Sequence, residues 1–320
     1  MNCHERNWAL ENEQSRFTAN SPPSWLTMSM FFVGLFALGM CASAGAADSP
    51  ASGFSNAPLS KVFQAWNQPF KPLRIVGNVY YVGASGVSSY LITSSEGHVL
   101  IDTGFEQTVP LIRDNVKTLG FRMEDIKLIL ASHAHVDHTG GHALMKQLTG
   151  ARILMSEADA ALLASGGKED FLDELMPYQP AKADQIVRDG EQVKLGKITL
   201  TAHLTPGHTK GCTTWTTVAE EKGKSYNVVF FGSTSVLTKL VNNSKYPGIV
   251  QDYAATFRKL KALPCDVFLA PHASFFGLEE KARHASEGTN PFVDPKAFHE
   301  YVTKAEQNFL KQLEKEQQSQ

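Results

Sequence analysis

Short apolar runs separated by polar turns dominate residues 73–270 of the chain. Runs of four to eight residues that are rich in β-branched and aromatic side chains, and that end at Gly, Asn, Asp or Ser, are typical of strands. Apolar residues at spacings of three and four instead indicate amphipathic helices. The pattern predicts strands at residues 73–76, 79–82, 87–93, 99–102, 126–131, 152–155, 197–204, 213–217, 228–231 and 266–270, and helices at 109–116, 142–148, 157–163, 253–263 and from Asp294 onward.

The order of these elements predicts the fold class. Strands come first, then a helix, further strands and closing helices, and this order occurs twice along the chain. Such an order favours an α/β fold with two mixed sheets packed face to face and helices outside, a four-layer αβ/βα sandwich. Several predicted strands end in a His or an Asp, so we expect a site along one edge of the sheets. Asp294 as N-cap and Pro295 in the first turn are typical of the start of the last helix.

The segment 168–183 carries apolar residues without clean periodicity. It is either a surface loop packed on its own apolar side chains or a flap over the site, and the pattern alone does not separate the two.

The amino terminus has a different composition from the rest of the chain. Residues 1–27 are polar and mixed, and residues 28–42 form a short apolar run that ends in small residues. An Ala-X-Ala pattern follows at residues 42–46, which is typical of a signal peptidase site. We therefore expect a polar leader at 1–27, with Met28 or Met30 as a possible true start, a signal peptide at 28–46 and one catalytic domain at 47–320. An uncleaved membrane anchor would need a longer apolar span.

Composition and charge further limit the kinds of protein that this chain can be. The chain has 320 residues, 42% of them hydrophobic, which is enough to fill a sizeable core. A net charge of −2 gives no electrostatic reason to expect nucleic acid as a partner. Export would leave Cys212 and Cys265 in the mature protein, either bridged or as two free buried thiols.

The densest chemical signal is Ser-His-Ala-His-Val-Asp-His at residues 132–138. It follows the buried strand 126–131 and precedes a short helix, so its side chains can converge on a cavity. His133 and His135 are two apart in extended chain and point to one side, where they can share a metal. Asp137 and His138 lie where the chain turns into the helix and suit a second metal. A merely polar loop is disfavoured, because burying so many polar groups without a cation is costly.

Two further histidines repeat this placement. His208, in Thr-Pro-Gly-His-Thr, and His272, in Pro-His, each follow an apolar strand directly. With the first loop they provide five imidazoles and one carboxylate, enough for two three-ligand zinc sites, each with a position open for water or substrate. The remaining histidines are expected on the surface or in packing roles: His98, His142, His203, His284 and His299.

These motifs together resemble the metallo-β-lactamase superfamily over roughly residues 73–301, and Asn-Pro-Phe-Val-Asp-Pro at 290–295 is similar to subclass B3. The resemblance implies two zinc ions per chain. It implies that the first zinc is bound by His133, His135 and His208, and the second by Asp137, His138 and His272.

One position discriminates within the superfamily. Many relatives, such as thioesterases and lactonases, place a metal-bridging Asp after the strand that corresponds to 228–232, and other lactamases place a Cys there. This chain has Ser233, which is similar to subclass B3. Ser233 and Ser235 are then candidates to contact a substrate carboxylate; each is equally well explained as a polar residue that caps a strand end.

The chain also departs from its relatives. A Pro-Gly-Tyr segment that some subclass B3 enzymes carry is missing near Thr238 and Lys239. Phe298 stands where many relatives have a cysteine that pairs with one like Cys265, so that bridge cannot form.

The resemblance implies hydrolysis of the β-lactam amide bond of penicillins, cephalosporins or carbapenems, and hence antibiotic resistance. The attacking group would be a metal-bound hydroxide oriented by Asp137, without a covalent intermediate. The expected partner is a β-lactam, and we expect a periplasmic monomer with no nucleic acid and no stable membrane association after cleavage. The alternatives are another dizinc hydrolase, a lactonase or thioesterase, or a non-catalytic periplasmic zinc-binding protein.

Overall fold

The computed structural model describes residues 60–172, 176–285 and 289–319. The expected leader and signal peptide, residues 1–46, lie outside the described residues. No helix in the described part of the chain is long and apolar enough to cross a bilayer.

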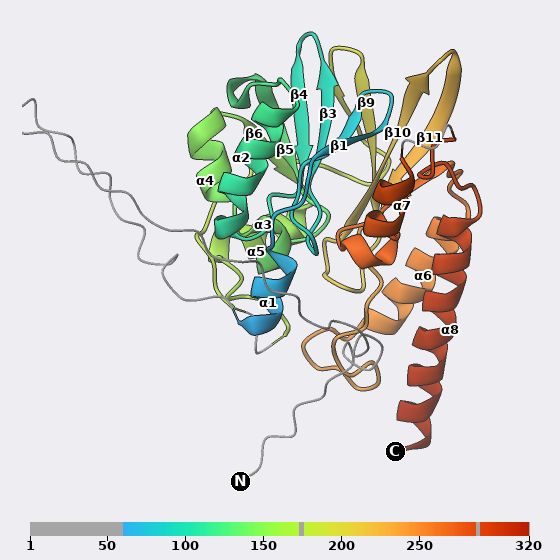
Figure 1. Ribbon diagram of the computed structural model, residues 1–320. Helices are drawn as coiled ribbons and strands as arrows, with labels where there is room; N and C mark the ends of the chain where they lie inside the picture. Colours follow the sequence, from blue (N-terminus) through green and yellow to red (C-terminus); the bar gives the residue numbers. More distant parts are fainter. Residues whose placement is uncertain (1–59, 173–175, 286–288, 320) are drawn as a thin grey trace, which may run out of the picture. The chain divides into compact units, whose positions relative to one another are not determined.

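Two mixed sheets form the centre of the fold (Figure 1). The first sheet has the order β1-β2-β3-β4-β5-β6-β7, antiparallel up to β4 and parallel from β4 to β7. The second has the order β12-β11-β10-β9-β8, in which only β11 and β12 pair in parallel. The strands of the first sheet are β1 (Leu73–Val76), β2 (Val79–Tyr81), β3 (Tyr90–Ser94), β4 (Gly97–Ile101), β5 (Ile126–Leu130), β6 (Arg152–Met155) and β7 (Gln185–Ile186). Those of the second are β8 (Gln192–Leu195), β9 (Ile198–Leu204), β10 (Thr213–Glu221), β11 (Lys224–Phe230) and β12 (Val267–Leu269).

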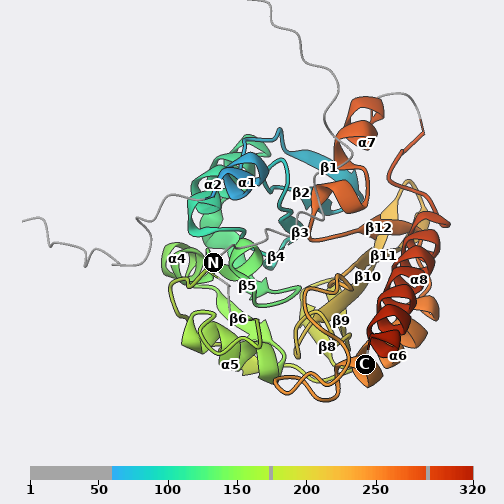
Figure 2. The same ribbon diagram turned by 90° about the horizontal axis from the view of Figure 1, so that it is seen from below.

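Helices cover the outer face of each sheet, as the view from below shows (Figure 2). The helices α2, α4 and α5 lie outside the first sheet, and α6 and α8 lie outside the second. The helices are α1 (Lys61–Trp66), α2 (Val109–Thr118), α3 (Val136–Thr139), α4 (His142–Thr149), α5 (Glu157–Ser165), α6 (Ile249–Lys261), α7 (Leu278–His284) and α8 (Ala297–Gln318), with short 3-10 turns at Glu106–Thr108, Met123–Asp125 and Ala273–Phe275. The predicted four-layer αβ/βα sandwich is confirmed.

Side-chain alternation along the strands explains the layering. On β3, Tyr90 and Ile92 point into the core between the sheets, whereas Leu91 points to the core under the first sheet's helices. The Tyr90 ring lies 5.2 Å from the ring of Phe230 on β11, which joins the two inner faces. Strands of this kind must be apolar on both faces, which explains the nearly continuous apolar runs in the sequence.

Several predicted element boundaries were wrong. Helix α6 begins at Ile249 rather than at residue 253, β10 continues to Glu221, and β11 begins at Lys224. The strand expected from residue 87 begins at Tyr90, and Val87 forms only an isolated bridge with His272. The last helix begins at Ala297 rather than at Asp294. The Asp294 carboxylate accepts hydrogen bonds from the backbone N–H groups of Lys296 and Ala297, so it caps the turn ahead of the helix.

Candidate metal centre

The loop after β5 carries the histidine-rich motif to the lower edge of the sheets in Figure 1, where α3 begins. His133 and His135 lie in the loop, and Asp137 and His138 lie in α3. His133, His135 and His138 are almost completely buried. The predicted position of the motif, between a buried strand and a short helix, is confirmed.

The first ligand cluster consists of His133, His135 and His208, which follows β9. One nitrogen from each ring lies within 4.8 Å of the others. The Nε2 atoms of His133 and His208 are only 3.2 Å apart. This convergence of three nitrogens is the geometry that a tetrahedral metal site with one open position requires.

In His133 and His208, the ring nitrogen that points away from the cluster, Nδ1, has a hydrogen-bond partner. Nδ1 of His133 lies 3.1 Å from the Ser132 hydroxyl, and Nδ1 of His208 lies 2.7 Å from the Ser235 carbonyl oxygen. A carbonyl can only accept, so His208 donates from Nδ1 and keeps a lone pair on Nε2. Such outer hydrogen bonds set the tautomer that a metal ligand needs.

The second ligand cluster consists of Asp137, His138 and His272, which follows β12. Oδ2 of Asp137 lies 3.2 Å from Nε2 of His138 and 3.5 Å from Nε2 of His272. The structure thus divides the six predicted ligands into the two predicted groups of three, and the two clusters share no residue.

Asp102 supports both clusters, a role that the sequence interpretation missed. Its carboxylate accepts hydrogen bonds from the Ser132 N–H and from the Ser132 hydroxyl, both at 2.7 Å, and lies 3.6 Å from Nδ1 of His138. Asp102 has a positive φ of 59°, a strained conformation for a residue other than glycine. An Asp at the end of a buried strand, beside the histidine loop, was the available signal.

Burial and neighbouring charges keep most of the clustered imidazoles neutral, so that they can bind a cation. Burial and neighbouring histidines hold the pKa values of His133 and His208 well below the ordinary value. Burial, with His138 nearby, lowers the pKa of His272 to about 4. These rings are neutral at neutral pH, the form that ligates metals. Burial opposes ionisation of Asp137, but the adjacent His138 and His272 lower its pKa, so it is a carboxylate.

The donor set fits two divalent cations. Among the residues that the structure describes, both ring nitrogens of His138 and Nε2 of His135 are buried without a hydrogen-bond partner. Buried polar atoms normally have partners, and a metal at the second cluster would supply one for Nε2 of His138, which lies 3.2 Å from Oδ2 of Asp137. Nε2 of His135 instead lies 3.4 Å from Oδ2 of Asp170.

The two predicted substrate contacts lie beyond the end of β11. The side chain of Ser233 is buried, and its hydroxyl accepts the Ser235 N–H at 3.3 Å. Ser235 is partly exposed, and its carbonyl holds His208 as described above. Ser235 is therefore the one of the two that is open to solvent.

The other histidines do not join either cluster. His142 is buried with Nδ1 2.8 Å from the Thr103 hydroxyl, and His98 packs against Phe121. His203 bonds to Thr216 on the neighbouring strand. This agrees with the packing roles expected from the sequence.

The segment 168–183 is anchored at the metal loop. The Tyr178 hydroxyl donates to the carbonyl of Ala134, which lies between His133 and His135, at 2.6 Å. Phe171 packs against Tyr246, with ring centroids 5.1 Å apart. The described parts of this segment are thus packed onto the protein beside the first cluster.

Cys212 and Cys265 are both free and both buried. The bridge between them that the sequence left open is therefore not formed.

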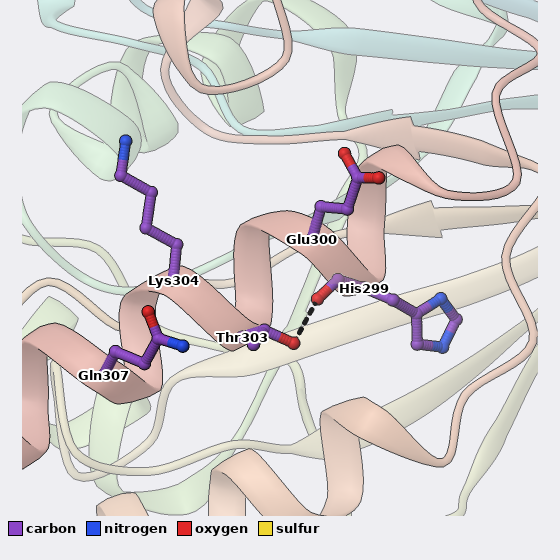
Figure 3. Close-up of a pocket in the computed structure, with 5 residues that line it drawn as sticks. All are labelled: His299, Glu300, Thr303, Lys304 and Gln307. Carbon is purple, nitrogen blue, oxygen red and sulfur yellow. Dashed lines mark hydrogen bonds between the residues drawn. The ribbon is translucent and has the colours of Figure 1, made fainter.

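A surface hollow lies on α8, away from the ligands (Figure 3). One face of the helix forms it, and the Thr303 hydroxyl donates to the His299 carbonyl of the same helix. It is lined by His299, Glu300, Thr303, Lys304 and Gln307. None of these residues belongs to a ligand cluster.

Comparison with known proteins places this centre in a family. The family model described as Metallo-beta-lactamase superfamily matches residues 82–272. The chain is 24% identical over 207 residues to the human mitochondrial persulfide dioxygenase ETHE1, covering 63% of this chain and 70% of that protein.

Solved structures are more similar. The FEZ-1 metallo-beta-lactamase from Legionella gormanii is 43% identical, with a TM-score of 0.77, covering 78% of this chain and 98% of that one. BJP-1, a subclass B3 metallo-beta-lactamase of Bradyrhizobium japonicum, is 41% identical, with a TM-score of 0.75, covering 79% and 97%. The chain, with its two histidine-rich clusters between paired sheets, belongs to the metallo-beta-lactamase superfamily and is a metal-dependent hydrolase of that fold.

Proposed function

We propose that this protein is a zinc-dependent β-lactamase that hydrolyses the amide bond of penicillins, cephalosporins or carbapenems and so gives antibiotic resistance. The observation that carries the proposal is the composition of the second cluster. His138 completes it, and no carboxylate of the described residues belongs to both clusters. That ligand set accords with the subclass B3 enzymes rather than with relatives that bridge their metals with an Asp.

Ser233 occupies the place of that bridging Asp. Its hydroxyl is directed to the backbone of Ser235 and not to a ligand cluster. A lactonase or thioesterase of this superfamily would need a carboxylate there, so Ser233 argues against both alternatives.

We propose zinc as the metal because five imidazoles and one carboxylate suit its preference for nitrogen ligands with an open position. Zinc in such a site supplies a water activated at neutral pH and a Lewis acid for the lactam carbonyl. The chain supplies the rest. The Asp137 carboxylate is part of the second cluster, and its oxygen that does not bind the metal could accept a proton from an attacking water.

The other residues of the site bind and orient the substrate. The hydroxyl of Ser235, at the exposed end of the β11 loop, would hold the carboxylate that β-lactams carry beside the ring. No side-chain nucleophile is required, so the reaction passes through no covalent enzyme intermediate.

The proposed activity also suggests a cellular location and an oligomeric state. A β-lactam hydrolase protects the cell if it meets the drug before the drug meets its target, so we propose export to the periplasm by the segment 28–46. We propose that the mature protein acts there as a monomer, on a small molecule, without nucleic acid.

The experiment is a substrate panel on purified, metal-loaded protein. Benzylpenicillin, nitrocefin and meropenem are compared with an acyl-homoserine lactone and an acyl thioester, with and without EDTA and with zinc restored. We expect β-lactam turnover that EDTA abolishes and zinc restores. The matched control is His299→Ala, which removes an imidazole of the α8 hollow and leaves the rate unchanged.

Two results would reject the proposal. Turnover of the lactone or thioester alone would assign the protein to another dizinc hydrolase. Tight zinc binding with no turnover of any substrate would favour the non-catalytic alternative.

A further inference from the structure

Two buried carboxylates lie beside the first ligand cluster without belonging to it. Asp159 is in α5 and Asp170 follows that helix by a few residues. Asp159 is 2% exposed and the side chain of Asp170 is 1% exposed. Carboxylates are almost never this buried unless they are paired, and neither forms an ion pair with a Lys or Arg among the described contacts.

Asp159 joins the two loops that carry the first cluster. Its Oδ2 accepts the Ala134 N–H and the Thr209 hydroxyl, each at 2.9 Å, and its Oδ1 accepts the Gly211 N–H at 2.9 Å. Ala134 lies between the ligands His133 and His135, and Thr209 is next to the ligand His208. One carboxylate therefore fixes the spacing between loops that are far apart in the sequence.

The backbone at Gly211 lies very close to the Asp159 carboxylate. A Cβ at Gly211 would lie 2.6 Å from Oδ1 of Asp159 and 2.2 Å from the Ser156 hydroxyl. The chain approaches α5 at a distance that only glycine allows.

Asp170 faces a ligand directly. Its Oδ2 lies 3.4 Å from Nε2 of His135, and neither atom has a hydrogen-bond partner among the described residues. A ligating histidine usually donates its other N–H to a carboxylate or carbonyl. If Nε2 of His135 donates to Asp170, Nδ1 remains to bind the metal.

The charges around the first cluster also indicate that Asp159 and Asp170 support a metal there. The three ligands of the first cluster are imidazoles, whereas the second cluster contains Asp137. A divalent cation among neutral ligands keeps its full charge in a buried site, and nearby carboxylates stabilise it. Burial raises the pKa of Asp159 to about 6, so this group is mostly ionised at neutral pH.

We propose that Asp159 and Asp170 are positioning residues of the first metal site: Asp159 holds its two ligand loops together, and Asp170 orients His135 to bind through Nδ1. The inference rests on the metal centre of the proposed function and not on the identity of the substrate. It predicts selective weakening of the first site when either carboxylate is removed.

The test measures metal affinity at each site separately. In a His272→Ala background the second cluster loses a ligand and the first site is titrated alone with Co²⁺ or Zn²⁺ against a competing chelator. In a His208→Ala background the second site is titrated alone. We expect Asp159→Asn and Asp170→Asn each to weaken first-site binding by about 10- to 100-fold and to change second-site binding by less than about threefold.

The matched control is Asp184→Asn. Asp184 also accepts a backbone N–H, that of Ile153 at 2.8 Å, and pairs with Lys146, but it contacts no ligand. It should leave both affinities unchanged. Circular dichroism of the metal-free proteins checks that each variant folds. Thr209→Val removes one of the three bonds to Asp159 and tests the same point, with a loss of several-fold, if Asp159→Asn does not fold.

The outcomes separate this inference from the proposed function. Unchanged first-site affinity in both Asp variants, or equal losses at both sites, would overturn the inference and leave the β-lactamase proposal intact. Selective first-site loss in a protein that hydrolyses no β-lactam would support the inference and reject the proposed function. A wild-type protein that binds no divalent metal would overturn both.

Discussion

Nδ1 of His208 lies 2.7 Å from the carbonyl oxygen of Ser235. The Tyr253 hydroxyl donates to the same oxygen at 2.8 Å. The Tyr253 ring also lies against Gly207, where an added Cβ would come within 2.7 Å of it. Helix α6 therefore positions His208, a candidate metal ligand, through contacts with the Ser235 carbonyl and with Gly207.

Tyr253→Phe should weaken the first metal site, because it removes the bond that holds the Ser235 carbonyl against His208. We expect a stability loss of about 1 kcal/mol and several-fold weaker first-site affinity, measured by urea unfolding and chelator competition. Tyr246→Phe is the matched control: it removes a hydroxyl bonded to Asp252 at 2.6 Å and should cost similar stability without affecting the metal. Equal metal affinity in both variants would contradict the prediction.

Asp137→Ala should abolish metal binding at the second site, because the remaining histidines offer only two ligands. We expect one metal per chain in place of two and a fall in kcat of about 100-fold or more. Elemental analysis and nitrocefin turnover check this. Full activity with one metal would show that Asp137 is neither a ligand nor a proton acceptor.

Ser235→Ala should raise KM for β-lactams by about tenfold with little change in kcat, because it removes a hydrogen bond to a charged substrate carboxylate. Ser233→Ala should have a smaller effect, since the Ser233 hydroxyl is buried and already bonded to the Ser235 backbone. Steady-state kinetics with benzylpenicillin separates the two. A larger effect for Ser233 would reverse their roles.

Stability should depend on pH through His142. Burial lowers the pKa of His142 from 6.5 to about 3. The unfolded chain therefore binds a proton below pH 6.5 that the folded chain does not, so stability falls as pH decreases through that range. From pH 7 to pH 5 this one group should cost about 2 kcal/mol. Urea unfolding of metal-free wild type and His142→Gln at both pH values should show a smaller loss in the variant; parallel losses would contradict it.

Metal removal should destabilise the whole domain. A ligand that binds only the folded state stabilises it by about 4 kcal/mol at about 1,000 times its Kd, so EDTA should lower Tm by several degrees or more. Differential scanning calorimetry with EDTA and with restored zinc measures this. The control is Asp137→Ala, which should lose less on EDTA treatment because it starts with one metal.

The sequence was sufficient to predict the six side chains of the two clusters, because each one directly follows a buried strand or lies in one dense motif. Both the strand and the residue after it are local features of the sequence. The division into two groups of three came from the resemblance to the metallo-β-lactamase superfamily, and the structure brings the same two groups together. The supporting carboxylates were not predictable in this way. Asp102, Asp159 and Asp170 act through contacts with Ser132, Gly211 and His135 that are distant in the sequence, and an isolated Asp carries no signal of its direction. The start of α8 was misplaced for a local reason, since Asp294 caps a turn rather than the helix itself.

Each ligand cluster draws two residues from the loop of the first sheet and one from the second: His208 follows β9, and His272 follows β12. A bound ion would therefore join two halves of the chain that are also linked at this edge by hydrogen bonds, such as those from the Thr213 N–H to the Ser132 carbonyl and from the Trp215 indole to the Ala131 carbonyl. Metal occupancy would therefore measure whether the two sheets have packed together in the native arrangement. A chain in which only one sheet had folded would lack a complete set of ligands for either ion.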